Sequence, residues 1–197
     1  MQQRIKYIQL VFEAIIPLAG YFLWDWSLYF ILLFYFIDIF VSEVIVHLKS
    51  SKVTRDHGNR ENRKAWIRNG FFSATLLLLC LVIIHFAMVQ IAVGIDFKNE
   101  FIAFWTYEEL GVQQGYLLVP LVAFAGYQQY KMEFLIPAKY RNTMVPAIWS
   151  PHIQALIIIM AFAGLCVGIA QLVIFPEIVY VLGIVLLSGA YRYMRIR

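Results

Sequence analysis

Charged residues are scarce in this sequence. Lysine and arginine together number 16 and aspartate and glutamate 12, so charged residues make up 14% of the 197 residues, whereas hydrophobic residues make up 62%. Soluble domains are usually about 45 to 50% apolar. The composition therefore excludes an ordinary soluble protein and indicates a membrane protein. The net charge of +4 does not indicate nucleic acid binding here, because its meaning depends on where the charges lie.

The motifs of several common enzyme and metal-site classes are also missing. The sequence contains no HExxH, CxxC, P-loop or GxSxG pattern. Its two cysteines, Cys80 and Cys166, both lie inside apolar runs, where a thiol usually packs as a small hydrophobic group. We therefore assign no disulfide, and the sequence favours a protein that is not an enzyme.

Six apolar segments follow one another along the chain with short connections. They cover about residues 5–24, 27–48, 70–93, 112–130, 152–174 and 177–193. A helix of about 20 apolar residues crosses a hydrocarbon layer of roughly 30 Å. We therefore predict an all-α, polytopic fold with one transmembrane domain over residues 1–197, built as a single bundle of six transmembrane helices.

The connections between these segments differ in character. Residues 49–69 are the most hydrophilic stretch and are predicted to form a polar loop. Residues 131–151 contain Pro137, Pro146 and Pro151, which favour a loop on the membrane surface over a continuous helix. Between the third and fourth spans, aromatic residues recur at helical spacing with acids between them, which predicts a short helix lying in the membrane interface. These aromatic residues are Phe97, Phe101, Phe104 and Trp105.

The basic residues are distributed unequally between the two ends of the predicted spans. All of the 16 lysines and arginines except Lys98 fall at the termini, in residues 49–69 or in residues 131–151. By the positive-inside rule, both termini and these two connections face the cytoplasm of a multi-pass protein in the bacterial cytoplasmic (inner) membrane. The basic connection at 49–69 also offers contacts to anionic membrane lipids.

The second apolar segment carries ionisable residues that oppose its insertion. Leu, Ile, Phe and Val each favour the bilayer by about 0.3 to 0.6 kcal/mol, whereas a central carboxylate opposes insertion by about 2.5 to 3.5 kcal/mol. Asp38 and Glu43 therefore bring the segment close to balance, and His47 follows one turn after Glu43. We expect these side chains to face protein or water rather than lipid.

Ionisable residues inside the spans are the candidates for a functional site. They are Glu13, Asp38, Glu43, His47, His85 and His152. One hypothesis is that they hydrogen-bond to one another and hold the bundle together. A second is that they bind a proton or an ion during transport. A third is that they bind haem or a divalent metal, with His47 and His152 as axial ligands because the two lie at similar depth.

Three short patterns resemble a family of small, six-span bacterial membrane proteins of unknown function. They are Tyr35-Phe36-Ile37-Asp38 running to Lys49, the span from Phe71-Phe72 to His85-Phe86, and Tyr140-Arg141 followed by Pro146 and His152. The sequence has Phe36 and Asp38 where the family usually has tryptophan and glutamate, and the spacing before His152 is longer. The resemblance implies six spans and emphasises Asp38, His85 and His152, but it implies no activity.

These observations favour a small transport-type protein or a subunit of a larger membrane assembly. Its expected partners are membrane lipids and other membrane subunits, either copies of itself or components of a larger complex. The alternative is a haem- or metal-binding protein, or an intramembrane enzyme, that uses the histidines and acids within the spans.

Overall fold

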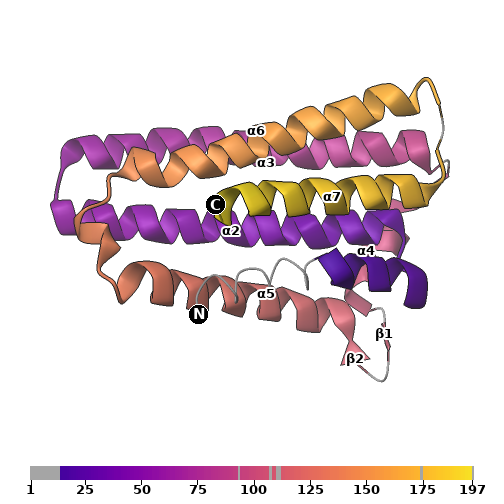
Figure 1. Ribbon diagram of the computed structural model, residues 1–197, viewed down its shortest axis with the longest axis horizontal. Helices are drawn as coiled ribbons and strands as arrows, with labels where there is room; N and C mark the ends of the chain where they lie inside the picture. Colours follow the sequence, from indigo (N-terminus) through magenta and orange to yellow (C-terminus); the bar gives the residue numbers. More distant parts are fainter. Residues whose placement is uncertain (1–13, 93, 107, 110–111, 174, 197) are drawn as a thin grey trace.

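The computed structural model describes residues 14–92, 94–106, 108–109, 112–173 and 175–196, and the described chain is almost entirely helical (Figure 1). The predicted all-α fold is thereby confirmed. The described strands are β1, Glu108–Glu109, and β2, Val112–Gln113, which form a short antiparallel pair between helices.

Three long helices run side by side and form the centre of the molecule. They are α2, Leu28–His57, α3, Arg60–Ile91, and α6, Val145–Ala170. In Figure 1, α3 and α6 run in the same direction and α2 runs against them. At 1.5 Å per residue, the helices are about 39 to 48 Å long, which exceeds the roughly 30 Å thickness of a hydrocarbon core.

Shorter elements surround these three helices. A helix at Ala14–Leu23 precedes α2, and α4, Phe97–Thr106, follows α3. Next come α5, Gln114–Tyr130, a π-helical turn η1, Lys131–Leu135, and a 3-10 turn η2, Lys139–Arg141. The chain then forms α6 and returns along the bundle as α7, Glu177–Ile196. The helix predicted between the third and fourth spans is present as α4.

The number of spans differs from the prediction. Among the described helices, three are long and apolar enough to cross a membrane, namely α2, α3 and α6, rather than six. Residues 5–13 of the first predicted span lie outside the described residues, and its described part is the short helix Ala14–Leu23. The fourth predicted span corresponds to α5, which has 17 residues with Pro120 inside it, and the sixth corresponds to α7, which begins at Glu177 as predicted. Both helices lie close to the predicted bounds, but α5 is shorter than the roughly 20 residues that a membrane-spanning helix needs.

The prediction of a polar loop at residues 49–69 was wrong. α2 continues to His57 and α3 begins at Arg60, so only Gly58 and Asn59 connect them. Gly58 adopts the left-handed conformation with φ of 58°, and the Asn59 side chain accepts a hydrogen bond from Glu61 N. Arginine, lysine and glutamate are good helix formers, so a hydrophilic stretch extends a helix as readily as it ends one.

The start of α6 also differs from the predicted boundary. The helix begins at Val145 rather than near residue 152. Pro146 lies in its first turn, where the missing N–H has no helical acceptor to lose. Pro146 is therefore compatible with a helix that begins at Val145, and α6 continues through Pro151.

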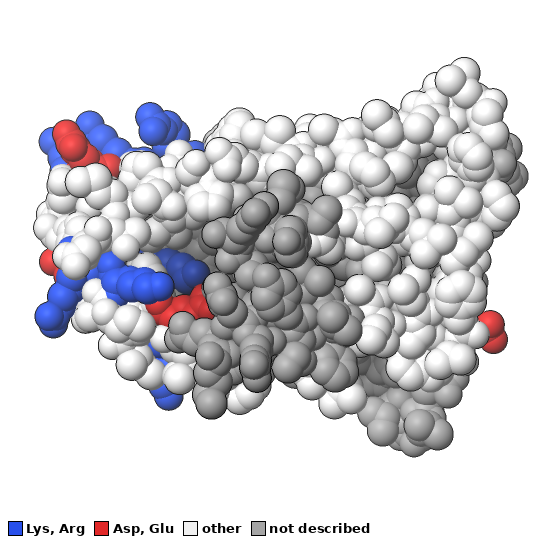
Figure 2. Space-filling view, viewed as in Figure 1, with Lys and Arg blue, Asp and Glu red and all other residues white. Residues whose placement is uncertain are grey.

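Basic side chains gather at one end of the molecule, where α2 and α3 are connected and α6 begins (Figure 2). The exposed members include Arg55, Arg60, Arg63, Lys64, Lys139 and Arg141. Lys98 belongs to α4 at the opposite end (Figure 1). The described residues thus reproduce the charge segregation in the sequence, while the compartment that each end faces stays a prediction.

Candidate polar centre between three helices

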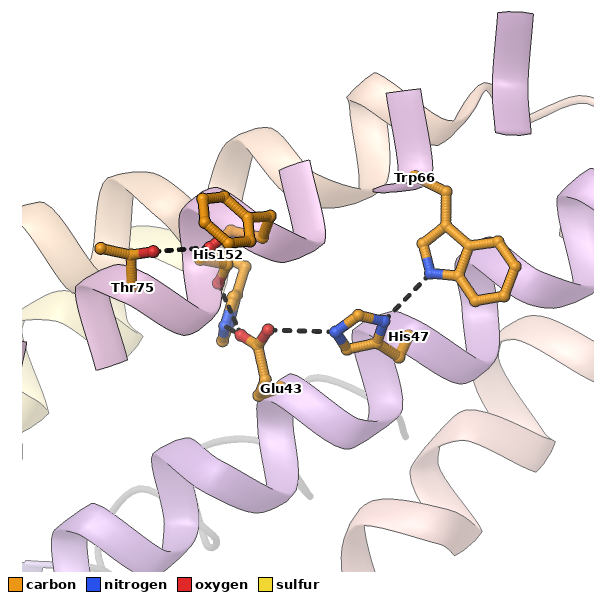
Figure 3. Close-up of polar contacts among 7 residues, drawn as sticks. Glu43, His47, Trp66, Thr75 and His152 are labelled. Atoms are coloured by element: carbon orange, nitrogen blue, oxygen red, sulfur yellow. Dashed lines mark hydrogen bonds and ion pairs between the residues drawn. The ribbon is translucent and has the colours of Figure 1, made fainter. Parts of the chain in front are cut away.

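Glu43 of α2 is a buried carboxylate, with 5% of the residue exposed. Its Oε2 atom accepts a hydrogen bond from Ser73 Oγ of α3 at 2.6 Å. The same oxygen lies 2.6 Å from His152 Nε2 of α6. One side chain therefore joins all three long helices (Figure 3).

His47 lies one helical turn beyond Glu43 and faces its second oxygen. His47 Nε2 is 3.3 Å from Glu43 Oε1, which is within ion-pair distance, although the two atoms do not meet hydrogen-bond geometry. On the other side of the ring, His47 Nδ1 accepts a hydrogen bond from Trp66 Nε1 of α3 at 3.0 Å (Figure 3). The His47 side chain is 41% exposed, compared with 7% for Glu43 and His152. His47 therefore connects the buried carboxylate to the surface of the protein.

Helical spacing places these side chains together. Glu43 and His47 are four residues apart and share one face of α2. On α3, the residues that face them are Trp66, Gly70 and Ser73, spaced by four and three positions. On α6, Trp149 and His152 are three positions apart, and both are buried. The same alternation of three and four residues continues along the buried faces of α3 and α6, as expected for helices packed nearly parallel.

Gly70 is required by the close approach of α3 to His47. A Cβ atom at this position would lie 2.7 Å from His47 Cε1. The His47 ring also meets Trp149, whose ring centroid is 4.9 Å away in an edge-on arrangement. Trp149 itself is fully buried, and its Cη2 atom would lie 3.6 Å from a Cβ at Gly70. Gly70 therefore leaves room for both aromatic rings.

The chemistry of this centre is that of a shared proton. Burying a carboxylate without partners costs several kcal/mol, and hydrogen bonds to a charged group each return about 1.5 to 3 kcal/mol. Ser73 is a donor to Glu43 in this arrangement. His152 Nε2 and Glu43 Oε2 are one hydrogen bond apart, so a single proton can be held by either atom.

The structure brings together three of the six candidate residues, Glu43, His47 and His152. Asp38 lies on α2 more than one turn before Glu43 and is half-buried. Glu13 lies outside the described residues.

His85 belongs to a separate polar group. Its Nδ1 donates to Leu81 O at 2.8 Å, and Tyr29 Oη lies 3.1 Å from its Nε2. Phe97 of α4 packs against the His85 ring. Tyr29 and Phe97 belong to the first turns of α2 and α4, so His85 lies toward the end of the bundle opposite the basic side chains.

Sequence reasoning missed the α3 side of the centre. Trp66, Gly70 and Ser73 carry no formal charge, so a search for ionisable residues passed over them. Their spacing was a usable signal, because a tryptophan, a glycine and a serine on one helical face mark a polar and closely packed contact. Trp149, one turn before His152, could have been found in the same way.

The two histidines predicted as haem ligands, His47 and His152, do lie close together, but both face the carboxylate of Glu43. Each Nε2 atom, of His47 and of His152, faces an oxygen of Glu43, and His47 Nδ1 is occupied by Trp66. Among the described residues, no group of three or more His, Cys, Asp or Glu side chains is placed to hold a metal ion. Haem or metal binding stays a prediction, which an absorption spectrum and a metal analysis would test.

Comparisons of the chain with protein-family models, with curated proteins and with solved structures gave no match. The resemblance to a six-span bacterial family therefore stays a prediction, and the inferences that follow rest on the geometry of the described residues.

Proposed function

We propose that this chain is a multi-pass protein of the bacterial cytoplasmic membrane that takes part in proton-linked transport through a proton-binding centre formed by Glu43 and His152. The observation that carries the proposal is the buried Glu43 carboxylate, which meets His152 at 2.6 Å and faces the partly exposed His47.

Membrane residence is supported by the apolar side chains that remain uncovered. In the most apolar part of each long helix, only 39% of α2 and 22% of both α3 and α6 is buried within the protein. Large side chains on several helices are exposed, including Phe71 at 77%, Leu78 at 64%, Phe124 at 63% and Leu186 at 71%. Lipid provides the apolar surroundings that this much surface needs.

Six spans remain our proposal for the arrangement in the bilayer. In addition to α2, α3 and α6, the chain has shorter apolar helices at Ala14–Leu23 and Glu177–Gly189, and the apolar helix α5. Shorter helices can be accommodated by local thinning of the bilayer and by flanking polar residues. The basic end and both termini would face the cytoplasm.

Proton binding is favoured over a purely structural tie by the asymmetry of the centre. A hydrogen bond that only holds helices together needs a donor and an acceptor that are both buried, as Ser73 and Glu43 are. His47 is different, because a large part of its side chain is exposed while Nε2 faces Glu43. It therefore offers a contact through which protons can reach the carboxylate.

The test is proton flux into liposomes that contain the purified full chain and a pH-sensitive dye. Glu43→Gln keeps the size of the side chain and removes its ability to exchange a proton. The matched control is Glu133→Gln, the same chemical change at a residue that pairs with Gln129 in an exposed position. We expect flux to fall at least about tenfold in the first variant, as for removal of a proton-transfer group, and to be unchanged in the second.

Two results would contradict the proposal. One is wild-type flux no higher than that of protein-free liposomes. The other is full flux in Glu43→Gln protein that elutes as a folded, single species.

A further inference from the structure

The two ring nitrogens of His47 face partners of different kinds. Nδ1 lies 3.0 Å from Trp66 Nε1, and Nε2 lies 3.3 Å from Glu43 Oε1. An indole N–H can only donate a hydrogen bond. Nδ1 must therefore be the unprotonated nitrogen, and the proton of the neutral ring lies on Nε2, the nitrogen that is 3.3 Å from Glu43 Oε1.

We infer that Trp66 is a positioning residue that holds His47 as its neutral Nε2–H tautomer. A second proton on His47 would have to bind Nδ1 and would displace the Trp66 hydrogen bond. His152 is then the histidine that shares a hydrogen-bonded proton with Glu43 Oε2, while His47 carries its Nε2 proton on the side of Glu43 Oε1. The tautomer follows from the contacts alone, but its part in proton transfer rests on the proposed function.

Among the described residues, the contacts of His47 include no further hydrogen-bond donor or charge. On α2 the ionisable group that faces it is Glu43, and on α6 the neighbouring ring is Trp149. α5 packs against another part of α2, where Gly126 approaches Val41 and Ile45, and its residues 114–130 include no charged side chain. Of the two tryptophans, Trp149 has the closer ring, at 4.9 Å against 6.3 Å, yet its indole N–H has no hydrogen-bond partner among the described contacts.

This difference between the tryptophans provides a matched pair of variants. Trp66→Phe removes the donor to His47 Nδ1, and Trp149→Phe removes an aromatic neighbour that donates nothing to it. The measurement is the nitrogen-15 NMR spectrum of the full chain in lipid, labelled at histidine. It distinguishes a protonated ring nitrogen from an unprotonated one.

We expect wild-type His47 to show an unprotonated Nδ1 and a protonated Nε2. His85 provides an internal reference for the opposite tautomer, because its Nδ1 donates to Leu81 O. Loss of one hydrogen bond of typical strength changes an equilibrium on the order of tenfold. In Trp66→Phe the ratio of the two His47 tautomers should shift by about this factor, and in Trp149→Phe it should not change.

A protonated Nδ1 on wild-type His47 would overturn the inference without any variant. The inference can therefore be refuted even if Trp66→Phe does not fold. An unchanged ratio in folded Trp66→Phe, or an equal shift in Trp149→Phe, would also overturn it. If the tautomer is as expected but the liposomes show no flux, the proposed function fails and the role of Trp66 in fixing the ring stands.

Discussion

Replacing Gly70 with alanine tests the packing of the polar centre, because two opposing effects can be separated. The new Cβ would lie 2.7 Å from His47 Cε1, too close for carbon atoms in van der Waals contact. The ring cannot rotate freely, since Trp66 and Glu43 occupy its nitrogens and Trp149 lies against it. Overpacking of this kind usually costs about 1 to 3 kcal/mol.

The same substitution has a favourable component. Glycine within a helix is less favourable than alanine by about 0.8 to 1.0 kcal/mol. We therefore expect Gly70→Ala to lower the free energy of unfolding by up to about 2 kcal/mol, the steric cost less the helical gain. In a His47→Ala background the clash is removed, and the same substitution should stabilise the protein by up to about 1 kcal/mol.

The assay is reversible unfolding in mixed micelles, followed by circular dichroism, for the four proteins of this double-mutant cycle. Gly164→Ala is the control, because a Cβ at Gly164 of α6 would meet nothing within 4 Å. It should be neutral or stabilising in both backgrounds. An equal effect of Gly70→Ala with and without His47 would refute the reasoning, because it would show that the ring is not what confines position 70.

Two further predictions concern the opposite end of the bundle. Ser27→Ala should lower the free energy of unfolding by about 1 to 3 kcal/mol in the same assay, because Ser27 Oγ accepts a hydrogen bond from Phe30 N at the start of α2 and donates one to Glu100 Oε2 at 2.6 Å. A Ser27→Thr variant keeps the hydroxyl and should retain most of the stability. Equal losses in both variants would argue against the hydroxyl contacts. Gly115→Ala should be more damaging than Gly70→Ala, because its Cβ would overlap the backbone oxygen of Phe104 rather than a side chain; unfolding midpoints in the reverse order would contradict this.

The helical class and the principal helices could be predicted from hydrophobic runs, because an apolar segment of 20 residues has few other stable forms in lipid. Helix ends were harder to predict. α2 and α3 continue well into polar sequence until Gly58 and Asn59, because water-exposed arginine and lysine do not disturb a helix. The end of α5 at Tyr130 agrees with the predicted end of the fourth span, but hydropathy did not predict the π-helical turn that follows it.

For the candidate site, spacing within one helix was predictable and contact between helices was not. Glu43 and His47 were recognisable as neighbours because they are four residues apart. The approach of His152, 109 positions away in sequence, depends on the register of α6 against α2. That register is set by uncharged residues, including Gly70 and Trp149. A sequence pattern within one helix therefore cannot predict it.

In the membrane that we propose for this chain, the polar centre has an energetic role that it would lack in water. Between helices surrounded by acyl chains there is little hydrophobic driving force, because lipid is as apolar as the side chains themselves. A carboxylate that contacts Ser73 and His152 therefore helps to select one register of α2, α3 and α6 from many of similar packing. The exposed edge of His47 adds nothing to that selection. A group that contacts the buried acid and also reaches the surface is what proton access requires, and for this reason we assign Glu43 a role beyond holding the helices together.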